Sequence, residues 1–151
     1  MRGLVPTLLA GALGGLALAS WMTPGAPVFG GVAAPAVSAR FGYCRGGGGT
    51  DCVVDGDTFR MAGERIRIAD IDTPETHPPR CAEEARLGEA ATRRLHALLN
   101  AGPVTLEPVD RDTDSYGRKL RIVTRGGRSL GDTLVAEGLA RPWTGRRQPW
   151  C

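Results

Sequence analysis

The sequence has almost no excess of charge of either sign. Its 151 residues include 19 Lys and Arg against 16 Asp and Glu, which gives a formal net charge of +3. This balance excludes a protein that coats nucleic acid by bulk charge, so any nucleic-acid contact depends on where individual arginines lie. The contents of 42% apolar and 23% charged residues also exclude a wholly disordered chain and a multi-helix membrane protein.

The N-terminal part lacks charge altogether, because no charged residue lies between Arg2 and Arg40. A single basic residue precedes an apolar stretch over residues 4–22, and the triplets 17–19 and 37–39 have the small residues of a signal cleavage site. The same stretch is just long enough to cross a bilayer as an uncleaved anchor. A buried core helix is a third interpretation.

We therefore predict a signal peptide or N-terminal membrane anchor over residues 1–22. Residues 23–40, rich in Pro, Gly and Ala, are predicted to be a flexible linker, and residues 41–151 a single folded domain, which we expect to be monomeric. Either kind of leader indicates export. The protein is then periplasmic or secreted, or is tethered through residues 4–22 in the inner membrane and faces outward.

The sequence also lacks the paired C-x-x-C spacing of many zinc sites. Its four cysteines are an even number, and together with the leader they indicate disulfides formed outside the cytosol. Four cysteines allow three pairings. We favour Cys44–Cys52, because the glycine-rich segment 45–51 is flexible enough to close a short loop, and this leaves Cys81 to pair with Cys151. Four reduced thiols are the alternative.

The order of predicted elements favours an α+β fold. A helix is expected where apolar residues recur on one face and Gly102-Pro103 ends the pattern, and a second, shorter helix is expected after a Ser129 cap. We predict a five-stranded OB-type β-barrel with two to three packed helices. The predicted strands are 53–54 continuing into 58–61, 64–69, 104–107 and 119–124, and the predicted helices are 82–100 and the segment from 130 to Gly138.

Two acidic clusters are candidates for a metal site. Asp55 and Asp57 flank a glycine, and carboxylates are the hard oxygen ligands that Ca²⁺ and Mg²⁺ prefer. Asp72 and Glu75 directly follow the isoleucine-rich strand, and Pro74 between them stiffens the segment. A rigid pair of acids is suited to holding a metal and a water molecule together. The alternative for each cluster is a solvated turn.

Two arginines supply the third element. Arg67 lies on the polar face of the strand that leads to Asp72, and Arg118 follows Tyr116-Gly117 at the start of another strand. A guanidinium matches two phosphate oxygens at once and offsets the charge that develops during phosphoryl transfer. Either arginine alone is also compatible with a solvated surface position.

Four separated motifs, in order, resemble the staphylococcal nuclease (thermonuclease) family. The resemblance runs from about residue 52 to residue 143, and its motifs are 54–58, 67–75, 114–118 and 134–140. It implies an OB-type barrel with packed helices and Ca²⁺-dependent hydrolysis of phosphodiester bonds in DNA and RNA. It also implies a role for each matching residue. The calcium ligands are Asp57, Asp72 and the backbone carbonyl of Thr73; the general base is Glu75; the phosphate-binding arginines are Arg67 and Arg118; a second acid near the metal is Asp55.

The sequence departs from the family pattern after residue 140. The founding member has tyrosines there that stack on the nucleotide, whereas here Trp143 is the residue able to offer a stacking face, with Tyr116 as a further supporting candidate. The founding member's long C-terminal helix is missing, and a disulfide through Cys151 takes over its stabilising role. The basic aromatic tail of Arg146, Arg147 and Trp150 either contacts nucleic acid or packs as a disulfide-held terminus.

Two function classes remain, and a third explains less. The first is an exported Ca²⁺-dependent nuclease that uses a metal-positioned water. The second is a catalytically silent OB-type module that binds nucleic acid. A binding module has no use for Glu75, a negative charge that faces a phosphate, so the complete set of acids and arginines favours the nuclease. A secreted disulfide scaffold without a ligand explains the cysteines but not the acids.

Overall fold

The computed structural model describes residues 34–46 and 48–151. The predicted signal or anchor, and the predicted linker as far as residue 33, lie outside the described residues. Strand β1 (Ala36–Val37) pairs antiparallel with β7 (Val104–Thr113), so the sheet already begins within the range predicted to be linker. In the part of the chain that the structure describes, neither helix is long and apolar enough to cross a membrane.

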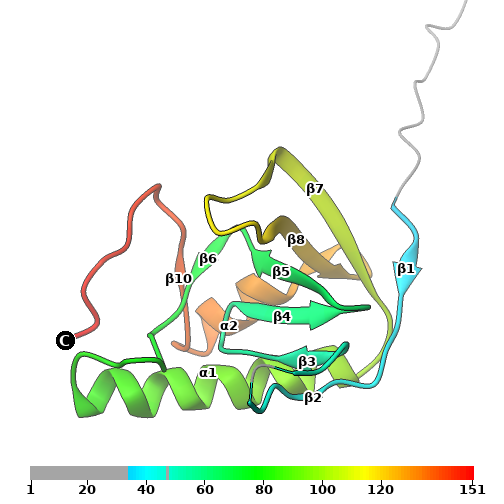
Figure 1. Ribbon diagram of the computed structural model, residues 1–151. Helices are drawn as coiled ribbons and strands as arrows, with labels where there is room; N and C mark the ends of the chain where they lie inside the picture. The colour runs from blue at the N-terminus through cyan, green and yellow to red at the C-terminus, as the bar shows by residue number, and fades with distance from the viewer. Residues whose placement is uncertain (1–33, 47) are drawn as a thin grey trace, which may run out of the picture. The chain divides into compact units, whose positions relative to one another are not determined.

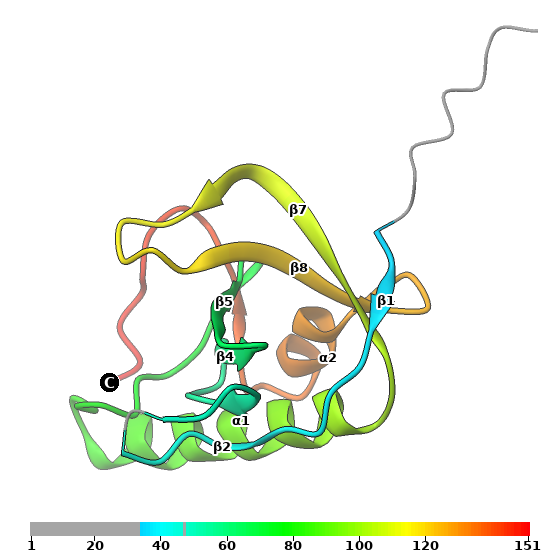
Figure 2. The same cartoon turned by 45° about the vertical axis from the view of Figure 1, so that its right-hand side comes forward.

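A curled, mixed β-sheet forms most of the domain (Figures 1 and 2). Its strands follow the order β1-β7-β8-β5-β4-β3-β2, and β9 pairs with β8 beside this path. The pairs β5–β8 and β2–β3 are parallel, and the other neighbours are antiparallel. The remaining strands of this sheet are β2 (Gly42–Tyr43), β3 (Cys52–Val53), β4 (Thr58–Met61), β5 (Glu64–Ile68), β8 (Lys119–Arg125) and β9 (Arg128–Ser129).

A second, two-stranded sheet joins β6 (Ile71–Asp72) to β10 (Arg141–Pro142). The α+β class is therefore confirmed, but the expectation of five strands is wrong, because the described residues form an eight-stranded and a two-stranded sheet. The extra strands are mostly two-residue pairings at the sheet edges, which are too short to show an alternating pattern in sequence. No pairing among the described residues joins β1 to β2 and closes the sheet into a ring.

Two helices pack on this sheet as expected. Helix α1 (Ala82–Asn100) has the predicted bounds and buries Ala91, Leu95, Leu98 and Leu99. Helix α2 (Leu130–Ala136) begins at the predicted cap, where the Ser129 hydroxyl accepts the backbone N–H groups of residues 131 and 132. Capping of this kind satisfies amides that have no partner within the helix.

One hydrophobic core joins the sheet to both helices. Phe59 and Ile68 from the sheet pack with Leu95 of α1 and Leu134 of α2, and each of these side chains is fully buried. The two predicted disulfides, Cys44–Cys52 and Cys81–Cys151, are both present, and no described cysteine is free. The second disulfide ties the C-terminus to the residue before α1, next to the acidic segment that follows β6.

Candidate active site

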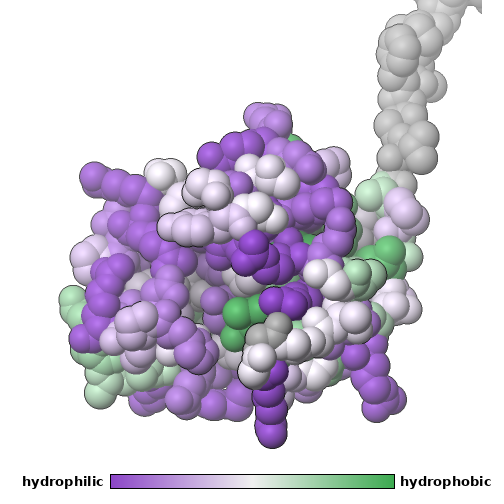
Figure 3. All heavy atoms as spheres, in the orientation of Figure 1, coloured by the Kyte–Doolittle hydropathy of each residue, from purple (hydrophilic) through white to green (hydrophobic). Residues whose placement is uncertain are grey.

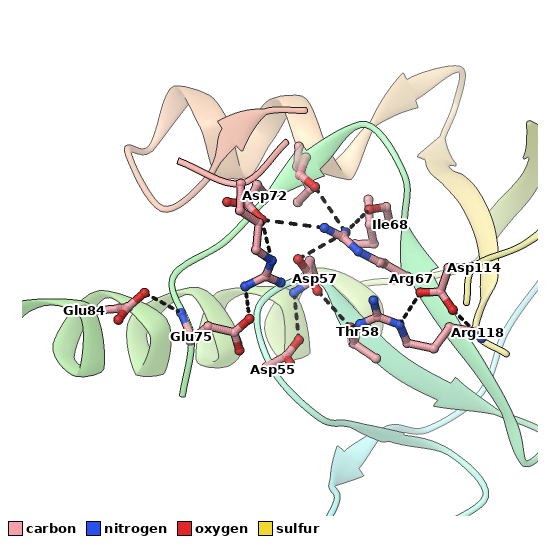
Figure 4. Close-up of polar contacts among 12 residues, drawn as sticks. Asp55, Asp57, Thr58, Arg67, Ile68, Asp72, Glu75, Glu84, Asp114 and Arg118 are labelled. Carbon is pink, nitrogen blue, oxygen red and sulfur yellow. Dashed lines mark hydrogen bonds and ion pairs between the residues drawn. The ribbon is translucent and has the colours of Figure 1, made fainter. Parts of the chain in front are cut away.

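The predicted site residues come together where some strands begin and others end (Figure 4). Asp57 directly precedes β4, Arg67 lies on β5, Asp72 ends β6 and Arg118 directly precedes β8. Glu75 follows in the loop between β6 and α1. These elements are neighbours because β4 pairs with β5 and β5 pairs with β8. The fold therefore gathers acids and arginines that are up to 61 positions apart in the chain.

Close packing against α1 holds both acidic segments. A Cβ atom on Gly56 would lie 2.6 Å from the Ala91 Cβ and 3.0 Å from the Thr73 Cβ, so the turn between Asp55 and Asp57 rests directly on the helix and on Thr73. Likewise, a Cβ atom on Gly88 would lie 2.9 Å from the Pro74 carbonyl oxygen. Glycine at these two positions lets the backbone segments approach as closely as they do.

Arg67 lies at the centre of the site and is buried, although alternation along the strand predicts an exposed position. Its Nη1 atom donates to the carbonyl oxygens of Ile68 and Ile71, at 3.0 and 3.2 Å. The same atom is 3.2 Å from Asp57 Oδ2, and Nη2 is 3.6 Å from Asp72 Oδ1. The guanidinium group also lies over the Trp143 ring, 5.3 Å from its centroid.

The two buried carboxylates have unused capacity for a cation. Asp57 Oδ2 and Asp72 Oδ1 are buried and accept no hydrogen bond from the described residues, although both face Arg67. Hard carboxylate oxygens of this kind fit Ca²⁺. Thr73 is buried beside them. No group of three or more Asp, Glu, His or Cys residues in the described chain could hold a metal, so a cation held by Asp57 and Asp72 would have to take its other ligands from backbone oxygens or water.

Burial shifts the protonation of two acids in the site. Burial, followed by the neighbouring Asp57 carboxylate, raises the pKa of Asp55 to about 7. At neutral pH the Asp55 carboxyl group is therefore only partly ionised. Burial also raises the pKa of Asp72, whereas the charge of Arg147 opposes this change. Burial disfavours the charged form of both carboxyl groups, so further positive charge beside them would stabilise their ionised forms.

Arg118 is held in place by hydrogen bonds from two directions. Its Nε atom donates to Asp114 Oδ2 at 2.7 Å, and its Nη1 atom donates to Thr58 Oγ1 at 3.2 Å. The Thr58 hydroxyl in turn donates to Asp57 Oδ1 at 2.8 Å. Burial raises the pKa of Asp114, but hydrogen bonds from Arg118 and the Tyr116 N–H outweigh it, so the net direction is downward. Tyr116 stays exposed, with Arg118 over its ring at 5.5 Å.

Glu75 is positioned through its backbone and remains partly open to solvent. The buried Glu84 of α1 accepts the Glu75 N–H at 3.4 Å through Oε1 and the Arg80 N–H at 2.5 Å through Oε2. The Glu75 carboxylate itself forms an ion pair with Nη1 of Arg147. The side chain of Glu75 is 30% exposed, so it is accessible to water and substrate in a way that Asp57 is not.

Two adjoining cavities meet at these residues. A groove of about 610 Å³ is lined by Asp55, Thr58, Glu75 and five arginines, and a smaller cavity of about 290 Å³ is lined by Arg67, Tyr116 and Trp143. Figure 3 shows that the face of the domain seen in Figure 1 is mostly hydrophilic, with apolar residues in small separate groups. A polar, arginine-lined groove fits a phosphate-bearing substrate. The five arginines are Arg60, Arg65, Arg80, Arg118 and Arg147.

Three residues contribute to the site without a role assigned to them from sequence, and a fourth, Arg147, is assigned only to a tail that either contacts nucleic acid or packs. Asp114 and Thr58 hold Arg118, Glu84 holds the backbone of Glu75, and Arg147 reaches Glu75 and Asp72 from the C-terminal segment. The spacing of Asp114 four residues before Arg118 is a local signal for the first of these. Thr58 ends the first of the four family motifs, and no local pattern marks Glu84 or Arg147 as part of the site.

Comparison with known proteins gives a consistent result. The family model described as "Staphylococcal nuclease homologue" matches residues 65–149, a range that contains Arg67, Asp72, Glu75 and Arg118 and begins after Asp57. The chain is 41% identical over 96 residues to the SPbeta prophage-derived endonuclease YokF of Bacillus subtilis (strain 168). It is 38% identical over 96 residues to endonuclease YncB of the same strain and 37% identical over 93 residues to the thermonuclease of Staphylococcus intermedius.

These matches cover about three-fifths of this chain, namely 60%, 60% and 59%. They cover 32%, 45% and 55% of the three relatives, so the chain matches about half or less of their length. The family match itself spans more than half of the chain. The chain therefore belongs to the family of staphylococcal nuclease homologues.

Proposed function

We propose that this protein is a nuclease that hydrolyses phosphodiester bonds of DNA or RNA with the help of Ca²⁺. The observation that carries the proposal is the convergence of Asp57, Asp72, Glu75 and two arginines on one arginine-lined groove. The names of the three relatives, two endonucleases and a thermonuclease, support it.

Each residue has a distinct task in the proposed reaction. Asp57 and Asp72, with the Thr73 carbonyl, would hold the cation, and Asp55 would add a partly ionised acid beside them. A bound Ca²⁺ offsets phosphate charge and orients water. Glu75 accepts the proton of the attacking water, since it is the accessible carboxylate of the set. Arg67 and Arg118 donate hydrogen bonds to phosphate oxygens as negative charge develops on them.

The aromatic residues complete the proposed substrate site. Trp143 lies over Arg67 and lines the smaller cavity together with Tyr116. Aromatic faces next to phosphate-binding arginines are suited to stacking on unpaired bases. We propose that this cavity takes a base of the substrate, and we expect the structure to accept single strands more readily than a rigid duplex.

We also propose that the family's OB-type barrel corresponds to the consecutive strands β7-β8-β5-β4-β3. These strands lie side by side in the sheet order and include the strands expected from sequence. Export of the protein remains a proposal, which the two disulfides support, because such bonds persist mainly in oxidising compartments.

The proposed function is tested with the purified full-length chain and fluorescent single-stranded DNA, duplex DNA and RNA. We expect cleavage in Ca²⁺ and none in a chelator. Binding of intact nucleic acid without any cleavage in Ca²⁺ would contradict the nuclease and favour the silent binding module. Cleavage that persists in the chelator would contradict the role of the cation.

Replacing Asp57 tests the cation site directly. Asp57→Asn keeps the side-chain shape and the contact with Thr58 but removes a negative ligand. Because altering even an outer partner of a ligand costs about 10- to 100-fold in metal affinity, we expect Ca²⁺ affinity to fall by at least about tenfold. Calorimetric titration measures this loss, and kcat at saturating nucleic acid and low Ca²⁺ should fall with it.

The matched control is Asp112→Asn, because Asp112 is a carboxylate outside the site that pairs with Arg121 at 2.7 Å. Its Ca²⁺ affinity and kcat should equal those of the unaltered chain. If Asp57→Asn lost activity while Ca²⁺ affinity held, Asp57 would not be a ligand.

A further inference from the structure

The C-terminal segment places one arginine across the proposed catalytic carboxylates. Nε of Arg147 lies 3.4 Å from Asp72 Oδ1, and its Nη1 atom forms an ion pair with Glu75. One guanidinium thus bridges a proposed cation ligand and the proposed general base. Its side chain is 34% exposed, so the group faces the groove rather than the core.

Several independent contacts fix the segment that carries Arg147. Strand β10 pairs with β6, and the Trp143 N–H donates to the Asp70 carbonyl oxygen at 2.8 Å. Arg141 donates to the Pro149 carbonyl oxygen at 2.9 Å and lies over the Trp150 ring at 3.8 Å. The disulfide from Cys151 to Cys81 closes the far end. Figure 1 shows this segment leaving β10 beside β6 and returning to the start of α1.

Arg147 faces the same space as the phosphate-binding candidate Arg118. Both residues line the groove of about 610 Å³ and the adjoining cavity of about 290 Å³. Within residues 34–46 and 48–151, the only carboxylates in ion-pair contact with Arg147 are Asp72 and Glu75. Both are acids that a cation and a reacting water would engage, so these ion pairs compete with the proposed chemistry as long as they last.

We propose that Arg147 is a third phosphate-binding arginine, which exchanges Asp72 and Glu75 for a phosphate of the substrate. The exchange follows from charge. A divalent cation at Asp72 removes much of the attraction for the guanidinium and repels it. A nucleic-acid strand in the same groove then supplies phosphate oxygens that a guanidinium binds in two-point geometry. Glu75 is thereby freed for its own task.

This inference rests on the proposed function for the class of its substrate, a polyanionic nucleic-acid strand. It goes beyond that function because it assigns a substrate contact to a tail that the disulfide and the β6–β10 pairing hold in place. Arg147 is a binding residue in this account and has no part in moving protons. Its loss should therefore affect KM more than kcat.

The test compares Arg147→Gln with Arg146→Gln in the full-length chain. Arg146 is the preceding, exposed arginine, and in the described part of the chain it forms no ion pair.

Initial rates on a single-stranded oligonucleotide in Ca²⁺ give KM and kcat, and calorimetric titration of the free protein gives Ca²⁺ affinity. A guanidinium–phosphate contact is charge-assisted, so we expect KM to rise about tenfold in Arg147→Gln. Ca²⁺ should bind more tightly to that variant, because no arginine has to leave Asp72. Arg146→Gln should change neither quantity.

Each outcome decides a part of the proposal. A KM in Arg147→Gln that is unchanged or lower would overturn the phosphate contact and leave Arg147 as a counter-ion of the two acids. An unchanged Ca²⁺ affinity would overturn the exchange. If the unaltered chain cleaves nothing, the nuclease proposal fails, and the oligonucleotide stays intact. The Kd of the protein for the intact oligonucleotide, measured by fluorescence anisotropy in Ca²⁺, then replaces KM. A higher Kd in Arg147→Gln, with no change in Arg146→Gln, would still support the phosphate contact.

Discussion

Glu75→Gln should reduce kcat by about 10²- to 10⁴-fold, which is the usual contribution of a general base. Glutamine keeps the shape of the side chain and the backbone N–H that Glu84 accepts, but it cannot take a proton from water. Substrate affinity should hold or increase, because a negative charge beside a phosphate is removed. The loss of the ion pair to Arg147 adds to this increase, since it frees a guanidinium that faces the same groove. Steady-state kinetics on single-stranded DNA in Ca²⁺ separates the two effects.

The control for this substitution is Glu89→Gln. Glu89 lies on α1, is 68% exposed and pairs with Arg93 at 3.6 Å. Its substitution therefore also removes one negative charge and one ion pair with an arginine. Its kcat should stay unchanged. If Glu75→Gln kept nearly full kcat, Glu75 would not be the base, and the proposed division of tasks among the acids would have to be abandoned.

The elements with a long, regular pattern could be predicted from sequence. Helix α1 has the expected bounds because apolar residues return to one face through five turns and Gly102-Pro103 ends them. The edge strands β1, β2, β9 and β10 could not be predicted, because a strand of two residues is too short to show an alternation of apolar and polar residues. Strand β7 is longer than expected and extends from residue 104 to residue 113. Its register shifts between Pro108 and Thr113, which interrupts the alternation on which the prediction depends.

The site was predictable to the extent that its motifs are local. The structure brings Asp57, Arg67, Asp72, Glu75 and Arg118 together as the resemblance implied, although their catalytic and metal-binding roles remain predictions. The burial of Arg67 was not predictable from alternation along the strand, since its neighbours come from other segments, among them Trp143, which is 76 positions away in sequence. The position of Arg147 depends on the Cys81–Cys151 disulfide and on the β6–β10 pairing. No sequence pattern within the C-terminal tail itself predicts where these contacts place Arg147.

Arg118→Ala should reduce kcat by about 10²- to 10³-fold, the loss typical of removing one donor that stabilises transition-state charge. The substitution removes the hydrogen bond to Thr58 and the ion pair to Asp114, but the Thr58 hydroxyl still donates to Asp57 and Asp114 still accepts the backbone N–H groups of residues 116 and 118. The free energy of unfolding should therefore change little, and urea denaturation checks this. Arg118→Lys should recover only part of the loss, because an ammonium group cannot bind Asp114 and a phosphate in the forked geometry of a guanidinium.

The matched control for Arg118→Ala is Arg121→Ala, three positions further along β8. Arg121 also forms an arginine–aspartate pair, at 2.7 Å from Asp112, but it lines neither of the two cavities at the site. Its kcat should remain that of the unaltered chain.

Combining Arg118→Ala with Glu75→Gln distinguishes a shared transition state from two independent effects. Residues that act on one transition state lose less together than the product of their separate losses. A double variant whose loss of kcat equals that product would mean that Arg118 and Glu75 contribute independently, whereas an Arg118→Ala loss confined to KM would make Arg118 a residue of substrate binding rather than of catalysis.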